Sequence, residues 1–223
     1  MKQDPFIIHL AEKYKTPAYT DCVGSGSIFG PALACAVALI EPYYNPVVND
    51  SKQLPHKVIY RLAPELKTKM IWAIGMVSAL ELQTIRNNLK GEHIAMCRAV
   101  LALKEKINVD VAFVDGKYPL PKTNIPSYGV IRGDCVSFGV ACASIIAKNE
   151  RDQLMMNKYG DQYARYHIRK NKGYRSPDHL LSIRKYGAVY PHHRTYLPQI
   201  KSVLSGDYDH VIFTKYKDRW EKV

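Results

Sequence analysis

The sequence predicts a layered α/β domain that is followed by a basic, mostly helical C-terminal region. Short apolar runs typical of buried strands alternate with longer amphipathic segments typical of helices, which is the pattern of an α/β fold. Lysine and arginine then dominate the chain beyond about residue 158, and a length of 223 residues suffices for one domain with a sizeable core. We therefore expect an N-terminal helical extension over 1–17, the α/β domain over 18–158 and the basic helical region over 159–223.

The individual elements follow from apolar periodicity and from the residues that end each run. Apolar and β-branched runs predict strands at 19–23, 35–40, 71–77, 109–114 and 128–131. Amphipathic spacing predicts helices at 6–14, 54–69, 80–106, 136–158, 178–186 and 197–204. We expect the third of these helices to be interrupted near Asn87, Asn88 and Gly91. The fourth begins with many small residues, which permit close packing against a sheet.

Composition excludes several classes of protein. Hydrophobic residues make up 47% of the chain and charged residues 23%, which is typical of a globular domain. No apolar run approaches the roughly 20 residues that a membrane-spanning helix needs, and the N-terminus has no apolar stretch of signal-peptide length. The five cysteines are odd in number and form no C-x-x-C pair, which argues against a disulfide framework or a zinc site. We therefore expect a cytoplasmic or other reducing compartment.

The excess positive charge points to a polyanionic partner. The net charge is +12, and much of the excess lies within 158–185, where five tyrosines are interleaved with the cations. The cations are Lys158, Arg165, Arg169, Lys170, Lys172, Arg175, Arg184 and Lys185. Cations neutralise phosphates and aromatic rings stack on bases or sugars, so the stretch is a candidate nucleic-acid surface. The alternative interpretation is a solvated basic face with tyrosines packed beneath it.

Three aspartates stand where strands end or helices begin. Asp21 closes the first expected strand, Asp115 follows the run 109–114, and Asp134 precedes the long helix. Ligand sites of α/β folds gather at strand ends, and clustered carboxylates favour Mg²⁺ or Mn²⁺. Taken singly, Asp134 could be a helix N-cap and Asp115 part of a turn. The glycine loop 24–30 also allows a dinucleotide-binding interpretation, but its spacing and its polar first strand match that motif poorly.

The order and wording of six segments resemble the ribonuclease HII family. The segments are 21–31 for D-E-A-G-R-G-P-L-x-G-P, 50–54 for D-S-K-K-L, 114–116 for V-D-G, 133–152 for G-D-x-x-S-x-x-I-A-A-A-S-I-x-A-K-x-x-R-D, 172–179 for K-G-Y-x-T-x-x-H and 187–196 for G-x-x-x-x-H-R-x-S-F. They cover the chain from about residue 19 to about residue 198, and the helix after Asp134 is the most specific of them.

The resemblance implies a ribonuclease H-like mixed sheet flanked by helices and an endonuclease that cuts RNA, including single ribonucleotides, in RNA–DNA duplexes. It implies a two-metal site for Mg²⁺ or Mn²⁺ in which Asp21 bridges the ions and Asp115 and Asp134 hold one each, with Asp152 in reserve. It also assigns nucleic-acid contacts to a further set of residues. These are Gly24, Ser25, Gly26, Lys52, Lys172 and Tyr174, the last packing on a sugar beside the RNA–DNA junction.

Two departures from the family pattern fall in the implied site. The glutamate that follows the first aspartate is Cys22 here, and the arginine of G-R-G is Ser25. A thiol suits Mg²⁺ poorly and removes a negative charge, so we expect weakened metal binding if Cys22 points into the acidic site. One interpretation is a weakened ribonuclease that uses another ligand. The alternative is a catalytically inactive nucleic-acid-binding module of a larger replication, transcription or ribosomal assembly.

Overall fold

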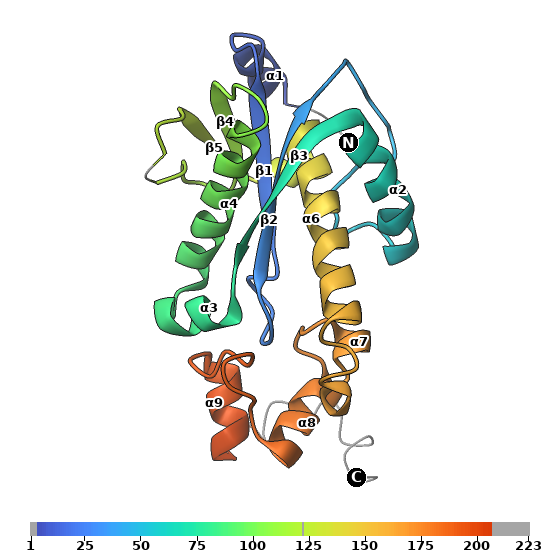
Figure 1. The fold of residues 1–223 in the computed structure, drawn as a ribbon, viewed down its shortest axis with the longest axis vertical. Helices are drawn as coiled ribbons and strands as arrows, with labels where there is room; N and C mark the ends of the chain where they lie inside the picture. Colours follow the sequence, from blue (N-terminus) through green and yellow to red (C-terminus); the bar gives the residue numbers. More distant parts are fainter. Residues whose placement is uncertain (1–3, 122, 207–223) are drawn as a thin grey trace. The chain divides into compact units, whose positions relative to one another are not determined.

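The computed structural model describes residues 4–121 and 123–206, and the chain divides into two compact units (Figure 1). The first unit comprises 1–25, 32–77 and 89–151, and the second comprises 26–31, 78–88 and the chain from 152 onward. Residues 1–3 of the expected N-terminal extension and 207–223 of the expected C-terminal region lie outside the described residues. The domain ranges expected from the sequence stay a prediction.

A five-stranded mixed sheet forms the centre of the first unit. Its order is β3-β2-β1-β4-β5, antiparallel among β1, β2 and β3 and parallel among β1, β4 and β5. The strands are β1 (Pro17–Val23), β2 (Ala32–Leu39), β3 (Met70–Val77), β4 (Val111–Asp115) and β5 (Ser127–Val130). β2 is buried along nearly its whole length, because its alanines, valine and leucines lie between helices on both faces.

Helices cover both faces of this sheet, as the first unit in Figure 1 shows. They are α1 (Pro5–Ala11), α2 (His56–Lys69), α4 (Asn88–Lys104), α5 (Gly133–Val136) and α6 (Phe138–Asn157). Glycines let two of them approach closely: Gly75 of β3 lies against the backbone of α4, and Gly139 of α6 lies against the ring of Tyr19. Since Tyr19 and Gly75 lie on opposite faces of the sheet by strand register, α4 and α6 cover opposite faces.

The second unit is mostly helical and has its own apolar core. Its elements are α3 (Ala79–Ile85), the 3₁₀ helix η1 (Ala164–Tyr166), α7 (Ile168–Asn171), α8 (Pro177–Tyr186) and α9 (Pro198–Ser205). The core packs around Phe29 and Tyr166, both fully buried, with leucine and isoleucine side chains of α8 and α9. Proline begins α8 and α9, where the missing N–H removes no helical hydrogen bond. In the described part of the chain, no helix is long and apolar enough to span a membrane.

The structure confirms the expected α/β class, the mixed sheet and each strand and helix to within a few residues. Two details of the prediction were wrong. The expected interruption falls at residues 86–87, between α3 and α4, but Gly91 does not interrupt a helix; it lies buried in the first turns of α4. The expected helix over 136–158 is broken at Ser137, whose backbone is extended, so that α5 and α6 are separate.

The contact between β3 and α4 predicts a sensitive position. A Cβ added to Gly75 would lie 2.0 Å from the carbonyl oxygen of Ala95 and 2.3 Å from the amide nitrogen of Ala99. Because both atoms belong to a helix backbone that cannot move aside singly, we expect Gly75→Ala to lower the free energy of unfolding by about 1–3 kcal/mol. Chemical denaturation measures this, with Gly26→Ala as the control, since no atom lies within 4 Å of the Cβ added there. Equal stability of the two variants would contradict the packing described.

Candidate active site

Asp21 lies near the end of the central strand β1 and faces α6. Its carboxylate is 4% exposed and accepts a hydrogen bond from the Ser144 hydroxyl of α6. The hydroxyls of Ser144 and Ser51 are themselves 2.8 Å apart and hydrogen-bonded. The helix that carries the most specific sequence motif and the D-S-K segment are therefore joined directly beside Asp21.

Asp115 and Asp134 reach the same face of the sheet from two other elements. Thr20 of β1 pairs with Val114 of β4 in parallel register, so the next residues, Asp21 and Asp115, lie side by side. The Gly133 amide donates to Asp115 Oδ1 at 2.8 Å, which ties the end of β4 to the start of α5, where Asp134 is 4% exposed. Asp134 is not an N-cap, because Arg132 occupies that position. The structure therefore brings the three aspartates predicted from the sequence together.

Burial and repulsion by neighbouring carboxylates raise the pKa values of Asp21 and Asp115. Burial first, and then the charges of Asp115 and Asp134, raise the pKa of Asp21 to about 8. Burial and the charge of Asp134 likewise raise the pKa of Asp115, against the hydrogen bond from Gly133. Protons or a cation must therefore neutralise the cluster near neutral pH. The donors are all hard oxygens, which fits a divalent ion such as Mg²⁺ or Mn²⁺.

Lys52 is the cation that the structure brings to this cluster. Its ammonium lies 3.0 Å from Asp134 Oδ2, and its side chain is 74% exposed while that of Asp134 is nearly buried. Partial desolvation lowers the pKa of Lys52, but the hydrogen bond to Asp134 and the nearby acids outweigh that effect and raise it. The ammonium partly balances the acids and reaches solvent, where a phosphate could meet it.

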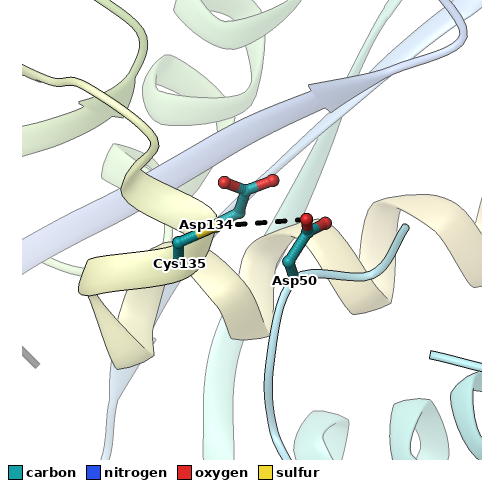
Figure 2. Close-up of side chains that lie close together, drawn as sticks. All are labelled: Asp50, Asp134 and Cys135. Atoms are coloured by element: carbon teal, nitrogen blue, oxygen red, sulfur yellow. Dashed lines mark hydrogen bonds between the residues drawn. The ribbon is translucent and has the colours of Figure 1, made fainter. Parts of the chain in front are cut away.

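A fourth carboxylate, Asp50, lies beside Asp134. Single ligand atoms of Asp50, Asp134 and Cys135 all lie within 4.8 Å of one another. Figure 2 shows these three side chains close together. Asp50 is 8% exposed and accepts hydrogen bonds from the Lys52 amide at 2.8 Å and from the side chain of Gln53 at 3.2 Å. Asp50 has no role predicted from the sequence, although it is the first residue of the D-S-K segment. Its partner Asp134 is 84 residues away in the chain, and only the fold joins them.

Cys22 follows Asp21 but leaves the sheet on the other face. It pairs with Ala34 across β2, and Ala34 pairs with Gly75, which faces α4. Side chains alternate along a strand, so the Cβ of Cys22 lies on the α4 face while Asp21 lies on the α6 face. The expectation that Cys22 points into the acidic site is therefore not supported by the register. The Cys22 amide donates to Asp21 Oδ1 at 2.6 Å, so this residue contacts the cluster through its backbone.

The glycine loop after β1 begins with a position that only glycine fits. Gly24 has a φ of +86°, and a Cβ there would lie 2.1 Å from Nε of the fully buried Arg151. Ser25 is half-buried and belongs to the same unit, whereas Gly26 belongs to the second unit and has open space around it. The predicted contacts of these three residues with nucleic acid stay a prediction.

The second unit carries the other residues predicted to bind nucleic acid. Lys172 ends α7 with a φ of +50°, and its ammonium donates to the Lys170 carbonyl at 3.3 Å. Tyr174 is half-buried, and its amide donates to the Asn171 carbonyl. Both acids of the basic stretch are paired, Asp161 with Arg169 and Asp178 with Lys170. Asp152, the reserve ligand, is fully buried on α6 in this unit, and its role stays a prediction.

Two buried histidines hold the backbone of Tyr174. His179 Nδ1 lies 2.9 Å from the Tyr174 carbonyl, and His179 Nε2 lies 3.1 Å from His193 Nε2. The Val189 amide donates to His193 Nδ1 at 2.8 Å. One arrangement satisfies all three contacts: both rings are neutral, His193 donates through Nε2, and His179 donates through Nδ1. A proton added to either ring would place two donors face to face or turn a donor toward the Val189 amide.

The chain resembles known proteins in both sequence and fold. The family described as Ribonuclease HII matches residues 19–197. A curated ribonuclease HII from Ehrlichia ruminantium is 40% identical over 185 residues, which are 80% of this chain and 84% of that protein. The crystal structure of ribonuclease H2 from Pyrococcus horikoshii has a TM-score of 0.68 at 21% identity and covers 86% of this chain and 98% of its own. The structure of Bst-RNase HIII in complex with Mn²⁺ has a TM-score of 0.67 at 19% identity, over 85% of this chain and 69% of its own.

The histidine pair predicts an acid-sensitive fold. Burial lowers the pKa of His179 to about 4 and, with the proximity of His179, that of His193 to about 3. Since the unfolded chain protonates near pH 6.5, the stabilising contribution is complete above that pH and is lost as the pH falls toward 4. We expect each histidine to cost about 2 kcal/mol of unfolding free energy at pH 5 relative to pH 7.5. His193→Gln, which does not titrate, should be less stable at pH 7.5 but should lose less between pH 7.5 and 5; parallel losses in urea denaturation would contradict this.

Proposed function

Because the chain belongs to the ribonuclease HII family, we propose that it is a metal-dependent endonuclease that cleaves RNA, including single ribonucleotides, within RNA–DNA duplexes. The family consists of hydrolases of this kind and depends on divalent metal ions. The observation that carries the proposal is the group of Asp21, Asp115 and Asp134 on one face of the sheet, where burial and the neighbouring charges raise the pKa values of Asp21 and Asp115.

The proposed ligands are the three aspartates, with Mg²⁺ or Mn²⁺ as the bound ions. When bound, such ions activate water and stabilise the leaving oxygen of a phosphodiester. The chain's own part is to hold the carboxylates ionised in a fixed arrangement. Ser144 donates to Asp21, Gly133 donates to Asp115, and Lys52 donates to Asp134. Each donor stabilises the charged form of its acid and restricts its rotation.

We propose that the activity is weakened, because the charge of the family glutamate is absent from position 22. A thiol is a soft ligand, and the Cβ of Cys22 leaves the sheet away from the acids. Asp50 supports residual activity, because it adds a hard carboxylate oxygen near Asp134. Asp50 does not follow Asp21 in the chain as the family glutamate does, so we expect it to replace that glutamate only in part. We also expect the site to tolerate Mn²⁺ better than Mg²⁺.

Nucleic acid is the proposed partner, held by the glycine loop, Lys52, Lys172 and Tyr174. The second unit supports this role with its cations and with tyrosines adjoining them, such as Tyr186 beside Arg165 and Lys185. We further propose a reducing, DNA-containing compartment such as the cytoplasm, because none of the five cysteines forms a disulfide bond.

The test of the metal site is a cleavage assay on a DNA duplex with one embedded ribonucleotide. We expect slow cleavage by the wild type in Mg²⁺ and faster cleavage in Mn²⁺. If its longer side chain reaches the acids from the α4 face, Cys22→Glu should raise the Mg²⁺ rate by orders of magnitude, since about 1.4 kcal/mol recovered in the transition state is tenfold; if the side chain stays on that face, the rate should not change. Cys22→Gln is the matched control, because it has the same shape without the charge, and should not raise the rate.

Two outcomes would change this conclusion. Full Mg²⁺-dependent activity of the wild type, lost in Asp50→Asn, would show that Asp50 replaces the glutamate completely. A folded Cys22→Glu variant that binds metal but remains inactive would locate the defect elsewhere, and a nucleic-acid-binding module without catalysis would then be the better description.

The role of Tyr174 has a separate test in binding. If its ring packs on a sugar or base, Tyr174→Ala should weaken binding to the ribonucleotide-containing duplex by about 1–3 kcal/mol. Tyr44→Ala is the control, since Tyr44 is 53% exposed and lies outside the residues proposed to bind nucleic acid. Fluorescence anisotropy in EDTA measures both affinities without cleavage. An equal loss in the two variants, or unfolding of Tyr174→Ala alone, would favour a packing role for Tyr174.

A further inference from the structure

A polar cavity lies in the second unit, between the end of α3 and the segment before α9. Its volume is about 380 Å³, which is within the usual range of ligand sites. It is lined by Gln83, Thr84, Arg86, Tyr190, Thr195 and Tyr196. None of these six is acidic, and four of them carry hydroxyl groups. Such a lining offers hydrogen-bond donors and one permanent positive charge, which is the chemistry that binds a phosphate group.

Arg86 supplies the charge, and it is available to a ligand. Its side chain is exposed, and no carboxylate in the described part of the chain forms an ion pair with it. Its backbone has a φ of +52°, a left-handed conformation that favours glycine or asparagine at the end of a helix. Residue 86 is therefore an arginine although its backbone conformation is one that glycine or asparagine adopts more readily. Arg86 is one of the residues that line the cavity.

The other side chains are held in place by contacts of their own. The Gln83 amide donates to the Thr195 hydroxyl at 2.9 Å, and the Tyr196 hydroxyl lies 2.5 Å from Asn88 Oδ1. Tyr190 is different, because it is 69% exposed, the largest value among the exposed large hydrophobic residues of the described chain. An exposed ring beside an arginine and several hydroxyls is suited to a sugar or base adjoining a bound phosphate.

We propose that this cavity binds a backbone phosphate of the nucleic acid, with Arg86 as its anchor and Tyr190 against the adjoining sugar or base. The site extends the nucleic-acid interface beyond the acids, the glycine loop and Tyr174. This inference rests on the proposed nucleic-acid substrate. Its cation, Arg86, lies outside the basic stretch 158–185, so charge patterning along the sequence does not identify it.

The salt dependence of binding tests the proposal. The probe is a fluorescent DNA duplex with one ribonucleotide, titrated with the full chain in EDTA at 50–200 mM KCl. Loss of one phosphate contact should reduce the slope of log affinity against log salt by about 0.9. We expect this change in Arg86→Gln, together with about tenfold weaker binding. Arg61→Gln is the matched control: it removes the same charge from an exposed position on α2 and should leave the slope nearly unchanged.

Two further variants separate the binding role from folding and from general charge. Arg86→Gly relieves the left-handed conformation, so it should melt no lower than the wild type and still lose binding as Arg86→Gln does. Arg86→Lys keeps the charge without the planar fork and should recover only part of the affinity. Equal losses in Arg86→Gln and Arg61→Gln, or wild-type affinity in Arg86→Gly, would overturn the site. Failure of the wild type to bind the duplex at all would instead overturn the proposed function, and this inference with it.

Discussion

The repulsion among three clustered carboxylates is the constraint on which the candidate site depends. Asp21, Asp115 and Asp134 come from a central strand, its parallel neighbour and a short helix; Asp21 and Asp134 are buried, and Asp115 is half-buried. Burying like charges together opposes folding unless protons, hydrogen bonds or a cation offset them. The fold supplies part of that compensation through Ser144, Gly133 and Lys52. A divalent ion would supply the remainder, so the proposed metal binding would offset the repulsion that the fold leaves uncompensated.

The scaffold around this cluster is stiff because helices lie very close to the sheet. Gly75 allows α4 to approach one face, and Gly139 allows α6 to approach the other. α6 carries Ser144 and Arg151, the first against Asp21 and the second against Gly24 at the start of the glycine loop. One helix therefore fixes both the acid and the loop that follows it. Rigid support of this kind keeps carboxylates at the spacing that a metal requires.

The two departures from the family pattern change chemistry while leaving this scaffold in place. Cys22 sits in regular strand pairing, and Gly24 keeps the close contact with Arg151 that excludes any other residue. Asp50 then becomes relevant, because it offers a carboxylate on the side of Asp134. The departures from the family motif concern charge and ligand type, and they are local. Their consequence is therefore expected in metal preference and rate, while the fold remains that of the family.

The sequence by itself determined the class of fold, the order of the elements and the identity of the main acids. Apolar periodicity located the strands and helices because it records which side chains must leave water, and six ordered motifs identified Asp21, Asp115 and Asp134. It did not show that Ser137 divides the helix after Asp134, since a single extended residue leaves no mark on periodicity. Nor did it indicate that Asp50 lies beside Asp134, or that Arg86, Thr195 and Tyr190 line one cavity. These are contacts between residues far apart along the chain, and only the register of the strands and the packing of the helices decided them. The side of the sheet on which Cys22 lies was also decided by the fold. Cys22 follows Asp21 in the sequence, but side chains alternate along a strand, so its Cβ lies on the opposite face of the sheet.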